Sequence, residues 1–302
     1  MIADRPAFGV LLMIGFCAIA PLGDAVAKLL GETIPLGQLI AVRFAAQALL
    51  LLPIIWLTGR SLAVSPRILR IAALRTVLHI IGIGGMFTAL RYLPLADAVA
   101  IAFVMPFIML LLGRWLLNEE VGPRRLAACV VGFIGTLLVV QPSFANVGWP
   151  AFLPLVVAVV FSFYMIVSRH IAKEADPLAL QAISGIMATP FVVFAIWLGH
   201  DSGFEWLGLK APDGYEIFLL IAIGCLGTLA HLLMTWSLRF APSATLAPIQ
   251  YLEIPFATAI GWIVFSDLPN GLAALGIAIT MAAGLYIVYR ERRRVEPIPP
   301  ET

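Results

Sequence analysis

Long apolar runs alternate with short polar breaks along almost the whole chain. Ten runs approach or reach the length of about 20 residues that crosses a bilayer as a helix: 8–30, 36–57, 68–90, 95–116, 124–141, 151–170, 178–198, 215–238, 244–265 and 271–290. The breaks carry turn-forming residues, as in "GETIP", "NEEVGPRR" and "SDLPNG". The runs are too long and too uniformly apolar for barrel strands. The pattern therefore predicts an all-α membrane protein with ten transmembrane helices.

The composition supports lipid as the main solvent of this chain. Of 302 residues, 62% are hydrophobic and 12% are charged, whereas soluble domains carry about 25% charged residues. Cys17, Cys129 and Cys225 each stand alone in an apolar run, so we expect no disulfide framework and no metal site. We expect no cofactor either, because the chain has no Walker loop and its "GIGG" does not follow a strand.

The basic residues predict the orientation, because cytoplasmic loops are enriched in Lys and Arg. If the N-terminus is cytoplasmic, only Lys28, Arg91 and Lys210 fall on the opposite side, and Arg43 and Arg75 lie inside helices. The other fourteen of the 19 face the cytoplasm: Arg5, Arg60, Arg67, Arg70, Arg114, Arg124, Arg125, Arg169, Lys173, Arg239, Arg290, Arg292, Arg293 and Arg294. We therefore expect an inner (plasma) membrane protein with both termini in the cytoplasm.

The C-terminal segment 291–302 is expected to be a cytoplasmic basic tail. Its run "RERRR" suits a surface of anionic lipid. The run is too short to suggest a nucleic-acid partner.

An internal repeat divides the chain into segments 8–142 and 150–290. "LRYLP" at 90–94 matches "LRFAP" at 238–242, and Pro106 is then followed by Phe107 as Pro255 is by Phe256. Because each copy holds five helices, an odd number, the second copy has to cross the membrane upside down. Inverted repeats of this kind are typical of secondary transporters.

The repeat also carries a family resemblance. The stretch "ALRYLPLADAVAIAFVMPFIMLLLGRWLLNEEVGPRRLAACVVGFIGTLLVVQP" at 89–142, with its echo at 237–289, resembles the EamA group of the drug/metabolite transporter superfamily. Within that group, "DAVAKLLGETIPLGQLIAVRF" at 24–44 and "YLEIPFATAIGWIVFSDLP" at 251–269 look most like carriers of S-adenosylmethionine and riboflavin. The resemblance implies a basket of ten helices around a central cavity that opens to the two sides in turn.

Glu253 is a carboxylate inside an apolar run, where a charge costs about 2.5–3.5 kcal/mol. Arg75 lies at a similar depth from the cytoplasmic side, so an ion pair between the two is expected. Three interpretations of Glu253 stay open: a salt bridge that only joins the halves, a group that binds substrate or a proton in a cavity, or a side chain that faces lipid.

Other charged residues are expected within the membrane. His79 lies one turn after Arg75, and it either bonds a backbone carbonyl or binds substrate or a proton. Asp24 and Lys28 are four residues apart, and Arg43 lies at a similar depth, which predicts an ion-pair cluster or an outer gate.

Four further polar residues receive structural interpretations. Asp97 is expected to stabilise the start of a helix. Glu119 and Glu120 are expected to be solvated loop charges, and His231 a packed core residue.

Aromatic residues on the helices that line the cavity in the family suit a flat or amphipathic substrate, although each alone could serve packing. They are Phe103, Tyr164, Trp236 and Tyr251, with Gln250 beside them as a polar group. Pro106 and Pro255 occupy repeat-related positions, and each removes a helix hydrogen bond. We interpret them as matched hinges or kinks.

The sequence predicts a secondary active transporter of a small organic metabolite, amphipathic or aromatic, such as S-adenosylmethionine, riboflavin or an amino acid. Its partners would be that substrate and the bilayer, together with protons if transport is coupled to them. We do not expect an enzyme, because no nucleophile accompanies Arg75, His79 and Glu253. A membrane-embedded enzyme and a non-transporting scaffold stand as the alternatives.

Overall fold

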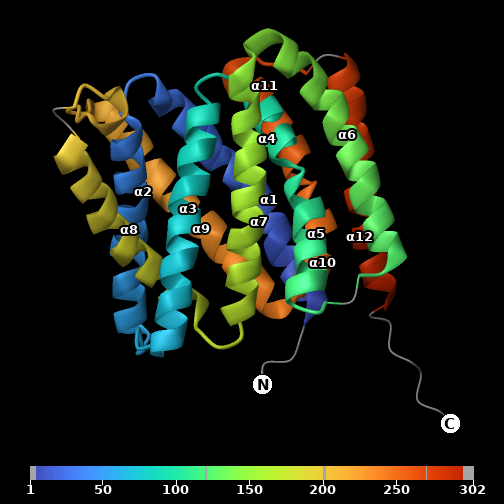
Figure 1. The fold of residues 1–302 in the computed structure, drawn as a ribbon, viewed down its shortest axis with the longest axis horizontal. Coiled ribbons are helices and arrows are strands. Elements are labelled where there is room, and N and C mark those ends of the chain that lie inside the picture. The colour runs from blue at the N-terminus through green and yellow to red at the C-terminus, as the bar shows by residue number, and fades with distance from the viewer. Residues whose placement is uncertain (1–4, 120, 200–201, 270, 295–302) are drawn as a thin grey trace.

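The computed structural model describes residues 5–119, 121–199, 202–269 and 271–294, and all regular structure in these ranges is helical (Figure 1). Glu120 and residues 295–302 of the expected tail lie outside the described residues. The helices are α1 (Pro6–Gly31), α2 (Leu36–Leu57), α3 (Pro66–Ala89), α4 (Leu95–Ala102), α5 (Met105–Leu116), α6 (Pro123–Val147), η1 (Trp149–Phe152), α7 (Leu153–Ile171), α8 (Pro177–Gly199), η2 (Glu205–Leu207), α9 (Gly214–Phe240), α10 (Ser243–Gln250), α11 (Glu253–Phe265) and α12 (Gly271–Arg294).

Polar caps and prolines at the turns fix where several helices begin. Ser65 accepts a hydrogen bond from the backbone N–H of Ile68, and Pro66 follows as the first residue of α3. At the start of α9, Asp213 and Glu216 form a reciprocal capping box with N···O distances of 2.7 and 2.9 Å. These contacts satisfy backbone N–H groups that the first turn of a helix leaves without partners.

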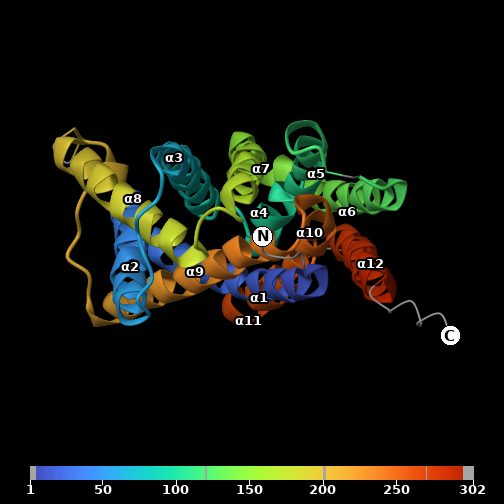
Figure 2. The same cartoon turned by 90° about the horizontal axis from the view of Figure 1, so that it is seen from below.

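The helices stand in two rows, seen from below in Figure 2. One row contains α8, α3, α7, α4 with α5, and α6, and the other contains α2, α9, α1, α10 with α11, and α12. Neighbours within and between rows pack closely, above all α1 with α9, α3 with α7, α2 with α8, and α6 with α12. Each row thus mixes helices from the first and second halves of the chain.

Helices α1 and α7 run through the bundle in opposite senses. Helix α1 starts at the end of the bundle where the N-terminus lies, whereas α7 starts at the other end (Figure 1). The first end, here called the basic end, holds Arg60 on Asp176, Arg67 on Glu174, and Arg169 on Glu119. The other end, here called the opposite end, holds contacts such as Lys210 on Glu216.

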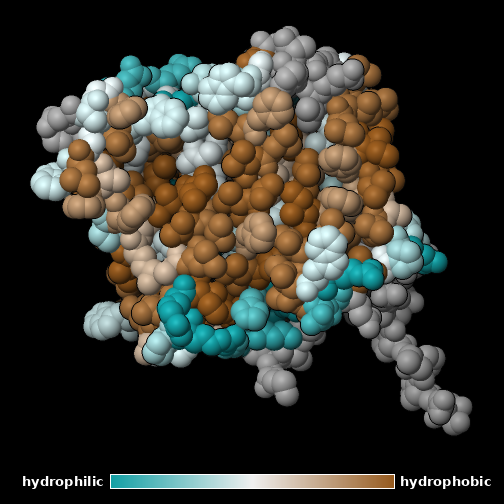
Figure 3. Space-filling model, in the orientation of Figure 1, coloured by the Kyte–Doolittle hydropathy of each residue, from teal (hydrophilic) through white to brown (hydrophobic). Residues whose placement is uncertain are grey.

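A broad apolar band covers the bundle between hydrophilic rims at its two ends (Figure 3). Large apolar side chains of several helices are strongly exposed, including Leu49 at 71%, Trp56 at 80% and Ile263 at 76%. Such a continuous apolar surface would be unstable in water and suits contact with lipid. In the described residues, eight helical segments are long and apolar enough to cross a membrane, and α6 and α12 contain shorter apolar runs.

Two expected helices are broken in the middle. The fourth apolar run becomes α4 and α5, and the ninth becomes α10 and α11. Pro106 is the second residue of α5 and Pro255 the third of α11, so neither the carbonyl of Ala102 nor that of Tyr251 receives its usual helix hydrogen bond. In a membrane interior, such irregular backbone is tolerated only where protein or a cavity surrounds it.

Close approach of helix backbones depends on particular glycines. A Cβ atom built on Gly185 of α8 would lie 2.9 Å from both the backbone N of Ala48 and the backbone O of Phe44 in α2. Backbone atoms cannot move aside as a flexible side chain can, so this site requires glycine. By contrast, a Cβ on Gly214, the first residue of α9, would meet nothing within 4 Å.

Replacing these two glycines by alanine should therefore change stability in opposite directions. Alanine favours a helix over glycine by up to about 1 kcal/mol, whereas overpacking a close contact costs about 1–3 kcal/mol. We expect Gly185→Ala to lower the melting temperature of the detergent-purified protein, and Gly214→Ala to leave it unchanged or raise it. Equal melting temperatures for the two variants would show that α2 and α8 do not meet as closely as described.

Candidate functional site

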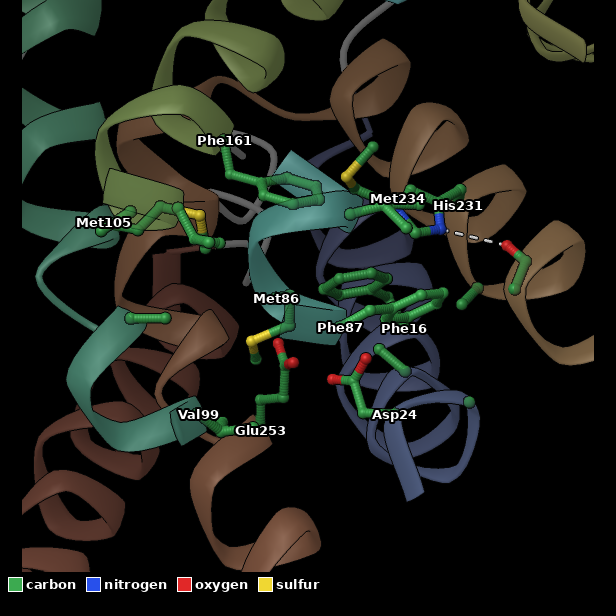
Figure 4. Close-up of a pocket in the computed structure, with 18 of the residues that line it drawn as sticks. Phe16, Asp24, Met86, Phe87, Val99, Met105, Phe161, His231, Met234 and Glu253 are labelled. Carbon is green, nitrogen blue, oxygen red and sulfur yellow. Dashed lines mark hydrogen bonds between the residues drawn. The ribbon is translucent and has the colours of Figure 1, made fainter. Parts of the chain in front are cut away.

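The interior of the bundle contains a pocket of about 90 Å³ between the two helix breaks (Figure 4). Its walls come from α1, α2, α3, α4, α5, α7, α9 and α11. Most of the larger lining side chains are phenylalanine or methionine: Phe16, Met86, Phe87, Phe103, Met105, Phe161, Met165 and Met234. The polar members are Asp24, Arg43, His231 and Glu253. A mainly apolar cavity with a few convergent polar groups is typical of a small-molecule site.

Two carboxylates face each other across this pocket. Asp24 projects from α1, and Glu253 is the first residue of α11, so its carboxylate lies at the start of the second half-helix (Figure 4). Glu253 is only 7% exposed. Neither acid has a hydrogen bond or salt bridge to another side chain within the described part of the chain. The partial positive charge of a helix N-terminus favours an acid at the position of Glu253.

Arg43 brings a cation to the same pocket but is bonded elsewhere. Its Nη1 donates to Gln47 Oε1 at 3.0 Å, and its Nη2 lies 3.0 Å from His231 Nδ1. The same Nδ1 lies 3.0 Å from the backbone oxygen of Gly227 (Figure 4). A Cβ on Gly227 would lie 1.9 Å from Arg43 Nε, so the guanidinium can pack against α9 only because residue 227 is glycine.

Arg75 lies in a separate cage of hydroxyl groups nearer the basic end. Its Nε donates to Ser168 at 2.8 Å, and its Nη1 to Ser184 at 2.7 Å. Its Nη2 donates to Tyr164 at 2.7 Å and to Thr235 at 3.2 Å. The cage therefore joins α3 to α7, α8 and α9 around one fully buried cation.

His79 lies one turn along α3 from Arg75 and belongs to a cluster of rings. Its ring centroid is 4.4 Å from that of His231, 4.6 Å from Tyr164 and 5.0 Å from Phe44. Neither ring nitrogen of His79 has a hydrogen-bond partner among the described residues, so the expected bond to a backbone carbonyl is not made. The ring cluster shares Tyr164 with the Arg75 cage and His231 with the pocket lining, so it contacts both.

The expected ion pair between Arg75 and Glu253 does not form. The four hydroxyl groups of the cage surround the guanidinium, and Glu253 faces Asp24 instead. The prediction rested on similar depth alone, and depth along a helix does not fix the direction in which a side chain projects. Lys28 is likewise separate from Asp24: its Nζ donates to the backbone oxygen of Leu93 at 2.5 Å, at the opposite end.

The other expected site residues divide between the pocket wall and the packing behind it. Phe103 lines the pocket and lies 5.6 Å from the ring of Tyr251, whose hydroxyl donates to the backbone oxygen of Cys129 at 3.2 Å. Gln250 Nε2 lies 3.1 Å from the sulfur of Met165. Trp236 packs on a separate apolar cluster that includes Leu51, Ile55 and Leu178, away from the pocket.

Both prolines interpreted as hinges lie within two residues of a side chain that lines the pocket. Each follows a helix break, and the first residue of each second half-helix, Met105 or Glu253, lines the cavity. Half-helix starts that point into a membrane cavity present partial positive charge and free backbone groups there.

Several lining residues were not anticipated from the sequence. His231, interpreted as a packed core residue, lines the pocket with Phe16, Met86, Phe87 and Phe161. Apolar side chains on an interior helix face look the same in sequence whether they fill a core or line a cavity. Of these residues, only His231 could have been identified as a pocket residue from the sequence, because it is a polar residue within an apolar run.

Glu119 also departs from its expected role as a solvated loop charge. Its carboxylate accepts hydrogen bonds from the backbone N–H of Ala244 at 2.9 Å, the backbone N–H of Ser243 at 3.2 Å, and the Ser243 hydroxyl. Arg169 Nε completes the contact at 3.3 Å, and both side chains of this ion pair are about 10% exposed. We call this set the Glu119 latch, because it fastens the loop after α5 to the start of α10.

Sequence comparison identifies the class of protein to which this bundle and pocket belong. The EamA-like transporter family matches the chain twice, over residues 7–141 and 148–290. The chain therefore belongs to the EamA-like transporter family, whose members are membrane carriers.

Individual relatives point to two kinds of cargo. The chain is 28% identical to a riboflavin transporter of Rhizobium johnstonii, over 73% of this chain and 70% of that one. It is 25% identical to an S-adenosylmethionine uptake transporter of Rickettsia felis, over 89% of this chain and 88% of that one. A solved crystal structure has the same fold, with a TM-score of 0.75 at 19% identity, over 96% of this chain and all of the other.

The Arg75 cage predicts a large effect of neutralising that residue. Arg75→Gln would leave several buried hydroxyl groups without their shared donor, and a hydrogen bond to a charged group contributes about 1.5–3 kcal/mol. We expect a loss of about 2–4 kcal/mol in unfolding free energy, measured by denaturation in detergent. Arg70→Gln is the matched control, because Arg70 is exposed on the same helix and should change stability by less than about 0.5 kcal/mol. If Arg75→Gln and Arg70→Gln lower the free energy of unfolding equally, the Arg75 cage does not stabilise the fold.

Proposed function

We propose that the protein is a secondary active transporter of a small organic metabolite and that the central pocket is its substrate site. The observation that carries the proposal is the pocket itself. It places two acids, a guanidinium and an imidazole in the middle of a lipid-facing bundle, between two broken helices. Polar groups at that depth are costly unless they serve a ligand, and family membership supports a ligand that is transported.

We further propose ten membrane crossings that form two inverted repeats of five. Exchanging the halves pairs α1 with α7, α2 with α8, α3 with α9, and α6 with α12. The close contact of α1 with α9 then becomes that of α7 with α3, while α2 with α8 and α6 with α12 map onto themselves. The opposite running senses of α1 and α7, and the two family matches, support the same relation.

The proposal orients the basic end toward the cytoplasm of the cell and places the protein in the inner (plasma) membrane. Arginines gather at this end, including Arg60, Arg67 and Arg169, and cytoplasmic loops are enriched in such residues. The N-terminal Arg5 also lies here, with its backbone N–H bonded to the oxygen of Phe240 at 2.9 Å.

In the alternating-access cycle we propose, the described structure is closed at the basic end. The Arg75 cage and the ring cluster around His79 lie between the pocket and that end, and the Glu119 latch lies further out. Opening toward the cytoplasm would separate these contacts. Lys28 would belong to the corresponding closure at the opposite end, where it bonds Leu93. Asp24 and Arg43 would act in the pocket. Bending at Pro106 and Pro255 would couple opening at the basic end to closure at the opposite end.

Transport by purified protein in liposomes tests the function directly. Vesicles preloaded with unlabelled metabolite should accumulate the labelled form by counterflow if the protein carries it, and the recovered label should be chemically unchanged. S-adenosylmethionine and riboflavin are the first compounds to test, because relatives are named for them. Conversion of the label would favour a membrane-embedded enzyme, and absence of flux for a broad metabolite panel would contradict the proposal.

Labelling of two repeat-related glycines tests the inverted arrangement. Gly122 and Gly271 follow the broken helix of the first and second half respectively, and a Cβ on either would meet nothing within 4 Å. In a background without native cysteines, a membrane-impermeant maleimide should label Gly271→Cys in intact cells. It should label Gly122→Cys only after permeabilisation. Labelling of both from one compartment would contradict the inverted repeat.

The Glu119 latch makes a separate prediction about transport rate. Glu119→Ala removes contacts to the start of α10 that are each worth about 1.5–3 kcal/mol, and about 1.4 kcal/mol corresponds to tenfold. We expect initial transport to fall by about tenfold or more while the protein remains folded. Glu174→Ala breaks an exposed ion pair with Arg67 at the same end and should stay within twofold of the parent. If the Glu119 variant transports as fast as the parent, the Glu119 latch has no role in the transport cycle.

A further inference from the structure

The two facing carboxylates are the feature of the pocket that the packing leaves unexplained. Glu253 is more than nine-tenths buried and projects into the cavity toward Asp24 (Figure 4). Within the described residues, neither acid is bonded to a cation or to a hydrogen-bond donor on another side chain. Two like charges that share a low-dielectric space repel each other, so the arrangement requires a bound proton or a compensating positive group.

Among the described residues, neither nearby arginine makes a hydrogen bond or salt bridge to the two acids, although Arg43 lies close enough to attract Asp24. Arg75 is enclosed by the four hydroxyl groups of its cage. Arg43 lines the same pocket, but its Nη atoms contact Gln47 and His231. Arg43 therefore offsets part of the charge of Asp24, but two acids share the pocket with one guanidinium that is hydrogen-bonded to other side chains.

The remaining lining favours an organic cation over a metal ion. Ca²⁺ and Mg²⁺ require about six or more oxygen ligands, and the described residues contain no group of three or more side chains suited to hold a metal. Aromatic rings and thioethers, such as Phe16, Phe87 and Met86, surround the acids instead. A cation that carries its charge on an alkylated centre is weakly hydrated, and it gains from contact with aromatic faces.

We propose that Asp24 and Glu253 form a cation subsite and that the transported metabolite carries an alkylated cationic centre on an apolar or aromatic body. This inference rests on the proposed transport function and specifies its substrate class. The positive centre of the substrate lies between the two carboxylates, and the body of the substrate packs on the phenylalanine and methionine side chains. Arg43 and His231 face the part of the substrate that carries an anionic or hydrogen-bond-accepting group.

A matched pair of compounds isolates the charge. S-adenosylmethionine carries a sulfonium centre, and S-adenosylhomocysteine is the corresponding thioether, smaller by one methyl group and less positive by one charge. Binding of each to the detergent-purified protein is measured by calorimetry, and competition of each against labelled substrate is measured in proteoliposomes. We expect the sulfonium compound to bind at least about tenfold more tightly, which corresponds to about 1.4 kcal/mol.

Variants of the two acids assign that preference to the pair. Asp24→Asn and Glu253→Gln should each bring the ratio of the two dissociation constants close to one. Glu253→Asp keeps the charge and should retain most of the preference. Glu174→Gln, which changes an exposed carboxylate outside the pocket, is the control and should behave as the parent. Melting temperatures of all four variants establish that they are folded.

The possible outcomes separate this inference from the transport function. If the parent carries riboflavin or another neutral metabolite and the acid variants bind it equally well, transport stands and the cation subsite is excluded. If both acid variants prefer the sulfonium compound as strongly as the parent protein does, the subsite is also excluded. Loss of all flux in the acid variants with the sulfonium preference intact would assign the carboxylates to a proton-carrying step and overturn the inference. If no compound is carried, the proposed function itself fails.

Discussion

The absence of water in a lipid interior is the constraint on which this structure depends. Each charge and each unpaired backbone group in the middle of the bundle has to find a partner or a cavity inside the protein. The chain meets this requirement by turning Asp24, Arg43, Arg75 and Glu253 inward while leaving an apolar surface for lipid. Arg75 is satisfied by hydroxyl groups and Arg43 by Gln47 and His231, whereas the two acids face a cavity.

The same constraint connects the helix breaks to the pocket. Prolines cannot complete the hydrogen bonds of a helix, and Pro106 and Pro255 each lie at the start of the second half of a broken helix. The resulting half-helix starts border the cavity, so a bend at either break changes its shape. Contacts at the basic end, among them the Glu119 latch, hold one arrangement of these half-helices.

The hydrophobic pattern was sufficient to predict the helical membrane fold, and the resemblance of the stretch at 89–142 and its echo at 237–289 predicted the family. They also singled out Glu253, Arg43 and Phe103, which lie at the pocket. The expected pair of Arg75 and Glu253 failed, because equal depth does not determine which way two side chains project. The role of Glu119 was hidden for a related reason: its partners, at the start of α10, are more than a hundred residues away in sequence.

The most direct test of the central claim is a structure of the protein with its transported metabolite bound. Our account predicts that the metabolite lies in the central pocket, with the α4/α5 break on one side, the α10/α11 break on the other, and Asp24 and Glu253 in contact with it. A metabolite bound instead in the surface groove between α2 and α8, lined by Val42, Val193 and Trp197, with the central pocket unchanged, would contradict it.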